Sequence, residues 1–159
     1  MPNDAIDHIL DELTMSKPTS TELITDEINT ALLANWTHGQ DERRTVSHDP
    51  VPVMRLHGQL GPAEWLITER STNEPDILFG LCDLGMGFPE IGYVSLSELK
   101  SVAIAGAFKI VREVGFTATF PISVYAQAAR LNSGITHDEK TLLQAKAVLD
   151  AERKRGGSH

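Results

Sequence analysis

The chain has 159 residues, of which 41% are hydrophobic, and its formal net charge is −8. A single domain of this size buries about 70% of the surface that its unfolded chain exposes, so a hydrophobic core is expected. The acidic balance argues against binding to phosphate backbones or anionic lipid by charge alone. One cysteine, Cys82, excludes an intramolecular disulfide and a cysteine-based zinc site.

The N-terminal part of the chain predicts two helices. Residues 4–15 carry apolar side chains at helical spacing and end before Pro18. A second helix is expected from Thr19 to about Trp36, because Thr19 and Glu22 have the spacing of a capping box. The first helix could pack on the domain or project from it as an arm that binds a partner.

The middle of the chain predicts an antiparallel sheet. After a polar loop at 37–50, alternating residues predict a strand at 51–57, and the segments between turns predict further strands at 65–68, 77–81 and 90–94. The segment 71–76 has the composition of a hairpin turn, and 85–89 forms a second, glycine-rich loop. No crossover helix separates these strands, so a mainly antiparallel sheet is expected.

The C-terminal part returns to helix. Ser95 and Glu98 have capping-box spacing and predict a short helix over 96–101. Residues 102–114 fit either helix or strand, 116–120 read as a strand, and 121–130 as a turn or short helix. A final helix is expected from 136 to about Arg153.

The expected fold class is therefore α+β, with a small, mainly antiparallel sheet flanked by N-terminal and C-terminal helices. The expected division of the chain is a helical arm at 1–18, an α+β core domain at 19–130, a C-terminal helix at 131–155 and a linker or tag remnant at 156–159.

Three segments carry a resemblance to a known family. They are WLITE (Trp65–Glu69), LFGLCDLG (Leu78–Gly85) and PEIGYVSLSEL (Pro89–Leu99), and together with ELITDEINTALLAN they resemble the bacterial domain of unknown function 2958. The resemblance covers about residues 20–120. It implies a small cytoplasmic protein encoded near plasmid and conjugative-element genes, and it assigns no catalytic residue. The helices before Pro18 and after Thr136 lie outside the family pattern and are the expected source of any specialised role.

Sequence spacing does not indicate a catalytic or metal site. A nucleophilic cysteine needs a neighbouring base or cation, and no histidine is spaced to lie beside Cys82, which we expect to be a buried apolar residue. Potential metal ligands are sequence-distant and lack the spacing of a helical His pair, so neither a metal nor another cofactor is expected. These potential ligands are His38, His48 and His57 with Asp41, Asp49 or Glu64.

Two enzymatic arrangements remain open. Strand pairing could bring carboxylates together as a general acid/base pair, as in a small hydrolase, or could place Cys82 beside a histidine. The residues concerned are Glu69, Asp83, Glu90 and His57, together with Glu98, which the capping box already explains.

The glycine-rich loop GMGFP is not a phosphate cradle, because its glycines lack the required spacing and no helix follows it. Gly85 and Gly87 are suited to positive φ, and Met86 and Phe88 either fold back on the sheet or form an apolar anchor for a protein partner. Basic residues cluster only at Arg43-Arg44 and Arg153–Arg155, so nucleic-acid binding is expected at most through a local patch. Apolar runs are too short to span a bilayer, so no membrane contact is expected.

The first functional hypothesis is a non-enzymatic protein-binding or regulatory protein of a mobile genetic element, which inhibits a host defence nuclease or modulates conjugation. The alternatives are the small enzyme described above and a structural subunit of a homo-oligomer. The expected partner contacts are Met86, Phe88 and Tyr93, with a second acidic surface formed by Asp4, Asp7, Asp11 and Glu12.

Overall fold

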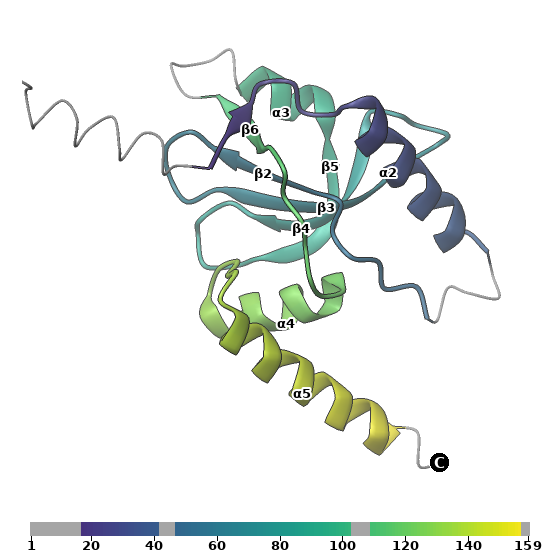
Figure 1. Cartoon of the computed structure of the whole chain (residues 1–159), viewed down its shortest axis with the longest axis vertical. Helices are drawn as coiled ribbons and strands as arrows, with labels where there is room; N and C mark the ends of the chain where they lie inside the picture. Colours follow the sequence, from purple (N-terminus) through teal and green to yellow (C-terminus); the bar gives the residue numbers. More distant parts are fainter. Residues whose placement is uncertain (1–16, 42–46, 103–108, 157–159) are drawn as a thin grey trace, which may run out of the picture.

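The computed structural model describes residues 17–41, 47–102 and 109–156. Within them, six strands form one sheet in the order β1-β6-β2-β3-β4-β5, and every neighbouring pair is antiparallel (Figure 1). The strands are β1 (Thr19–Ser20), β2 (Met54–Gly58), β3 (Glu64–Arg70), β4 (Ile77–Asp83), β5 (Glu90–Ser95) and β6 (Ile110–Glu113). The helices are α2 (Asp26–Gly39), α3 (Leu96–Val102), α4 (Ile122–Asn132) and α5 (Glu139–Gly156). The predicted α+β class and antiparallel sheet are confirmed.

Helices cover both faces of the sheet, with α2 and α3 on one side and α4 and α5 on the other (Figure 1). Strand alternation supplies apolar side chains to both layers. Trp65 and Ile67 pack with Leu32 of α2 in the first core, whereas Leu66 between them packs with α4 and α5 in the second core. None of the helices in the described ranges is long and apolar enough to cross a membrane.

A β-bulge in β3 determines which face of the sheet the Glu69 side chain occupies. Ile67 pairs with Gly80, but Glu69 pairs with Phe79, so Thr68 is an extra residue without a partner position. Residues directly opposite one another on paired strands share a face. Phe79 lies on the face that carries Leu81, and the bulge therefore turns Glu69 toward the α4 side.

The start of the first described helix differs from the expectation. Thr19–Ser20 form β1 on the edge of β6, and α2 begins only at Asp26. Thr25 is the N-cap, its hydroxyl accepts a hydrogen bond from the Ile28 amide at 3.3 Å, and two acidic residues follow in the first turn. The Thr19–Glu22 pattern was thus overridden by pairing with a distant strand. The helix predicted over 4–15 lies outside the described residues.

The predicted strand at 116–120 is also wrong. The ambiguous stretch before it supplies β6, and Gly115 then turns the chain with φ of +77°. The following residues leave the sheet, and Phe116 and Phe120 pack against the second core. Their apolar alternation reflects burial under α4 and α5 rather than strand pairing. The predicted strands of the β2–β5 region and the helices at 96–101, 121–130 and 136–153 are confirmed with small shifts in their ends.

Candidate functional site

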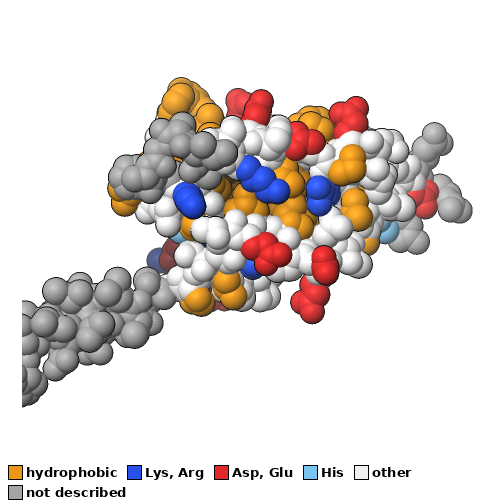
Figure 2. Space-filling view, turned by 90° about the horizontal axis from the view of Figure 1, so that it is seen from above, with side chains coloured by type: hydrophobic (Ala, Val, Ile, Leu, Met, Phe, Trp, Pro, Cys, Tyr) orange, Lys and Arg blue, Asp and Glu red, His pale blue; other side chains and the backbone are white. Residues whose placement is uncertain are grey.

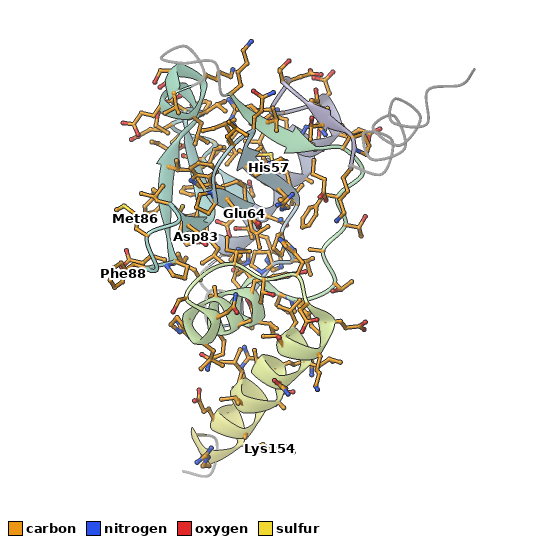
Figure 3. The ribbon with its side chains drawn as sticks, turned by 90° about the vertical axis from the view of Figure 1, so that its left-hand side faces the viewer. His57, Glu64, Asp83, Met86, Phe88 and Lys154 are labelled. Carbon is orange, nitrogen blue, oxygen red and sulfur yellow. The ribbon has the colours of Figure 1, made fainter. Side chains whose placement is uncertain are left out.

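The predicted contact residues of the glycine-rich loop lie at the outer side of the sheet. Phe88 is 80% exposed, Met86 69% and Tyr93 67%. Gly85 and Gly87 have φ of +79° and +86°, as expected, and they direct the intervening loop outward. Figure 3 shows Met86 and Phe88 pointing away from the interior, where His57, Glu64 and Asp83 lie.

Strand β5 forms one edge of the sheet and pairs only with β4 in the part of the chain that the structure describes. Ile91 on this strand is 44% exposed. The ring centroids of Tyr93 and Phe79 are 5.1 Å apart. We call Met86, Phe88, Ile91 and Tyr93 the edge surface. The edge surface thus places large apolar side chains beside the outer edge of β5. Exposed apolar side chains and accessible strand edges are both common in protein-binding sites.

A groove of about 530 Å³ runs between the edge surface and helix α4. Phe88 and Ile91 line it from the strand side, and Ala126 and Arg130 line it from the helix. The lining is mixed, because Glu90 and Arg130 contribute charged groups beside the apolar side chains. Such a groove can accept an apolar side chain from a segment that lies along β5.

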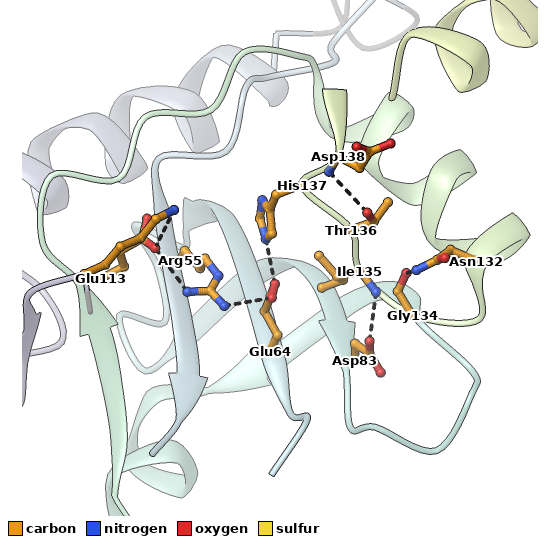
Figure 4. Close-up of polar contacts among 11 residues, drawn as sticks. Arg55, Glu64, Asp83, Glu113, Asn132, Gly134, Ile135, Thr136, His137 and Asp138 are labelled. Carbon is orange, nitrogen blue, oxygen red and sulfur yellow. Dashed lines mark hydrogen bonds and ion pairs between the residues drawn. The ribbon is translucent and has the colours of Figure 1, made fainter. Parts of the chain in front are cut away.

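The interior of the α4 face holds a chain of charged side chains (Figure 4). Arg55 donates to Glu64 at 3.1 Å and to Glu113 at 3.2 Å. His137 lies 2.8 Å from the second oxygen of Glu64, and Lys17 lies 3.3 Å from Glu113. The side chains of Glu113 and Glu64 are only 5% and 11% exposed, so these contacts compensate for removing two carboxylates from water.

Asp83 and Glu64 together hold the connection between α4 and α5 on the sheet. They are opposite one another on β4 and β3. Asp83 accepts the amide of Ile135 at 2.9 Å and that of Gly85 at 2.8 Å, while Glu64 contacts His137. Burial raises the pKa of Glu64, but the hydrogen bonds and charges of His137 and Arg55 outweigh it and leave the pKa below the ordinary 4.5.

A pocket of about 570 Å³ lies beside this charge network. Lys17, Glu113, Tyr125 and His137 contribute to its lining. The carboxylate of Glu64 orients the His137 imidazole, an arrangement that suits a general base. The described residues that line the pocket include Thr117 but no serine or cysteine, so they present no nucleophile–base pair of the Ser–His or Cys–His type.

The structure does not bring the predicted carboxylates into one acid/base pair. Glu69 contacts His48 at 2.6 Å, His57 contacts its neighbouring Gly58 carbonyl, and Glu90 is exposed on β5. Sequence reasoning missed the roles of Arg55 and Glu113 and the His137 contact of Glu64. The alternation of β2 and its pairing with β3 could have placed Arg55 beside Glu64, whereas Glu113 and His137 come from distant elements.

Comparison with known proteins then places the chain. A family model described as protein of unknown function (DUF2958) matches residues 23–136. The chain belongs to this family. The match includes the sheet from β2 to β6 and helices α2 to α4, so it extends past the expected limit near residue 120. No curated protein and no solved structure shows significant similarity to the chain.

Other predicted features of this DUF2958 protein have different outcomes. The acidic residues Asp4, Asp7, Asp11 and Glu12 lie outside the described residues, as do Arg43-Arg44. Arg153 in the C-terminal basic group pairs with Asp49 at 3.3 Å. On the face seen in Figure 2, Lys and Arg side chains are interspersed with Asp and Glu, so that face carries no continuous basic surface.

Cys82 is expected to react slowly with thiol reagents in the folded protein. It packs against the first core, and burial raises the pKa of its thiol to about 11, so the reactive thiolate is scarce at neutral pH. Labelling with a chromogenic disulfide reagent should be much slower in buffer than in denaturing urea at the same pH. Equal rates in the two conditions would show that the thiol is accessible and reactive.

Proposed function

We propose that this DUF2958 protein is a non-enzymatic protein-binding or regulatory protein of a mobile genetic element, which holds an extended segment of a partner along β5. The observation that carries this proposal is the outer edge of β5, which no strand of the described residues pairs with, beside the exposed Met86 and Phe88. Large apolar side chains next to an unpaired strand edge are costly in water unless a partner covers them.

The bound segment adds one strand to the sheet. Its backbone pairs with the outer edge of β5, which supplies affinity that does not depend on sequence. Alternate side chains of an extended segment point to the same face, so one apolar side chain can contact Ile91 and Tyr93 and another can enter the groove beside Ala126. Phe88 serves as the anchor at one end of the contact.

Charge favours a partner that works on nucleic acid. The chain has a formal net charge of −8, whereas proteins that bind nucleic acid carry basic surfaces. Opposite charge accelerates the encounter and disfavours wrong partners. A host defence nuclease or a component of the conjugation apparatus has this chemistry, and inhibition or modulation of such a protein is the role that we propose.

Capture from lysate of the native host, with matched variants as bait, tests this proposal. The wild-type chain should retain a protein in stoichiometric amount, and the double variant Met86→Asp and Phe88→Asp should lose it. Val114→Asp is the control, since Val114 is 42% exposed just after β6, which β2, β3 and β4 separate from β5 in the sheet. The retained protein, once purified, should bind wild type and Val114→Asp equally in a calorimetric titration.

Two outcomes would contradict the proposal. Equal binding of the purified partner to the double variant would place the contact elsewhere on the molecule. The second outcome would come from light scattering at two protein concentrations. If the wild-type chain dimerises and the double variant stays monomeric, a second copy of the chain occupies β5. The chain would then be a subunit of a homo-oligomer.

A further inference from the structure

Two histidines that are ten positions apart in the chain face one another at the end of α2. His38 lies in the last turn of α2, and His48 lies in the segment that leads to β2. Their Nδ1 atoms are 3.2 Å apart. The other ring nitrogen of His48, Nε2, is 2.6 Å from Oε1 of Glu69. This His38–His48–Glu69 cluster belongs to neither the edge surface nor the charge network.

The carboxylate of Glu69 fixes the orientation of the His48 ring. A carboxylate only accepts hydrogen bonds, so Nε2 of His48 donates its proton to Glu69. In the neutral form of His48, Nδ1 carries the lone pair and accepts the Nδ1 proton of His38. Glu69 is buried and was turned to this position by the bulge in β3, so the orientation of His48 is built into the sheet.

Gly39 leaves the room that the His48 ring occupies. A Cβ atom at this position would lie 2.7 Å from Nε2 and 2.8 Å from Cδ2 of His48. The backbone of Gly39 is not in the left-handed region, so the missing side chain serves space rather than an unusual backbone conformation. The last turn of α2 is thus shaped around the ring that Glu69 holds.

We infer that His38 and His48 form a binding site for a divalent transition-metal ion of the Zn²⁺ class. Two nitrogen ligands of tetrahedral zinc lie about 3.3–3.4 Å apart at the usual bond length of about 2.0–2.1 Å, close to the observed separation. A histidine ligand commonly donates its second ring proton to a carboxylate, which is the contact between His48 and Glu69. The ion replaces the Nδ1 proton of His38, which moves to Nε2 of the same ring through solvent.

Water or a partner's side chain completes the coordination. No group of three or more His, Cys, Asp or Glu side chains in the described ranges can hold a metal ion, so the two imidazoles are the ligands that the structure assigns. His38 is exposed, so water can reach the ion. An ion bound here connects the end of α2 to the segment before β2 and stabilises the folded state by mass action.

Calorimetric titration of the untagged full chain with Zn²⁺ tests the inference. We expect saturable binding of one ion per chain and a concentration-dependent rise in Tm. Both effects should be lost in His38→Ala and in His48→Ala. His57→Ala should bind as wild type does, since His57 lies on the face of β2 that is remote from α2. Mg²⁺, which prefers oxygen ligands, should not bind there.

Two further variants test the positioning of His48 without removing either ligand. Glu69→Gln should weaken Zn²⁺ binding by about 10–100-fold. Gly39→Ala should also weaken it, because the new methyl group displaces the ring. Circular dichroism checks that each variant is folded. In ¹H–¹⁵N spectra of the wild type, Zn²⁺ should shift the ¹⁵N resonances of Nδ1 of the two histidines. No saturable binding by the wild type, or equal loss in His57→Ala, would overturn the inference and leave the proposed function of the edge surface untouched.

Discussion

Replacing Arg55 by methionine is expected to lower the free energy of unfolding by about 3–5 kcal/mol, the usual range when one partner of a buried ion pair is removed. Methionine keeps much of the side-chain volume, so packing changes little. The loss arises because Glu64 and Glu113 keep their charges in the interior while their shared cation is gone. Urea unfolding followed by circular dichroism measures the change.

The matched control is Lys146→Met in α5. Lys146 pairs with Asp150 at 2.8 Å, but both side chains are about half exposed, so its loss should cost no more than about 0.5 kcal/mol. The double variant Arg55→Met and Glu64→Gln should recover part of the stability that Arg55→Met loses, because one uncompensated charge is removed. A single Arg55→Met variant as stable as the Lys146→Met control would show that the network contributes little.

The effect of Arg55→Met should also depend on pH. The pKa of Glu64 is lower in the folded protein than its ordinary 4.5, so the stability that the ionised carboxylate contributes is fully present above that value. It is lost as the pH falls through the folded pKa. The stability difference between wild type and variant should therefore be constant near neutral pH and shrink in acid below 4.5.

Gly80→Ala is expected to destabilise the protein by about 3 kcal/mol or more, or to prevent folding. A Cβ at this position would lie 2.1 Å from the Leu66 carbonyl oxygen and 2.8 Å from Cα of Ile67. Both atoms belong to the backbone of β3 at the bulge, so neither can rotate away as a side chain would. Strands β3 and β4 would have to separate in the centre of the sheet.

Gly92→Ala is the matched control for this variant. Gly92 is directly opposite Gly80 on β5, and a Cβ there meets nothing within 4 Å. The change should leave stability within about 0.5 kcal/mol of the wild type. Urea unfolding of both variants, with solubility as a second measure for Gly80→Ala, gives the comparison. Similar stability of the two variants would mean that β3 moves aside at little cost.

Local signals made the β2–β5 region predictable. Strand β2 alternates apolar and polar residues, β3 and β4 are short apolar runs, and turn residues separate the strands. Neighbours in sequence are therefore neighbours in the sheet. The outward direction of Met86 and Phe88 was left open by the sequence but depends on the two flanking glycines. In contrast, the start of α2 was misread because Thr19 pairs with Glu113, a partner far along the chain.

The charged clusters could not be read from spacing for the same reason. Arg55 and Glu64 lie on the paired strands β2 and β3, but His137 comes from the connection before α5 and reaches Glu64 only through the packing of the C-terminal helices on the sheet. The bulge adds a second difficulty. Regular alternation would place Glu69 on the α2 face with Ile67, whereas the extra residue Thr68 reverses it and brings Glu69 to His48.

The strand order has a consequence for how the protein folds. Strands β2 to β5 are joined to their neighbours by short connections, so their pairing closes small loops, whereas β6 must return from beyond α3 to pair with β2 and then accept β1. Small loops lose less entropy on closing and form sooner. We therefore expect the β2–β5 meander to assemble first during synthesis, with the edge that we propose as the binding surface already formed before the chain's last strand arrives.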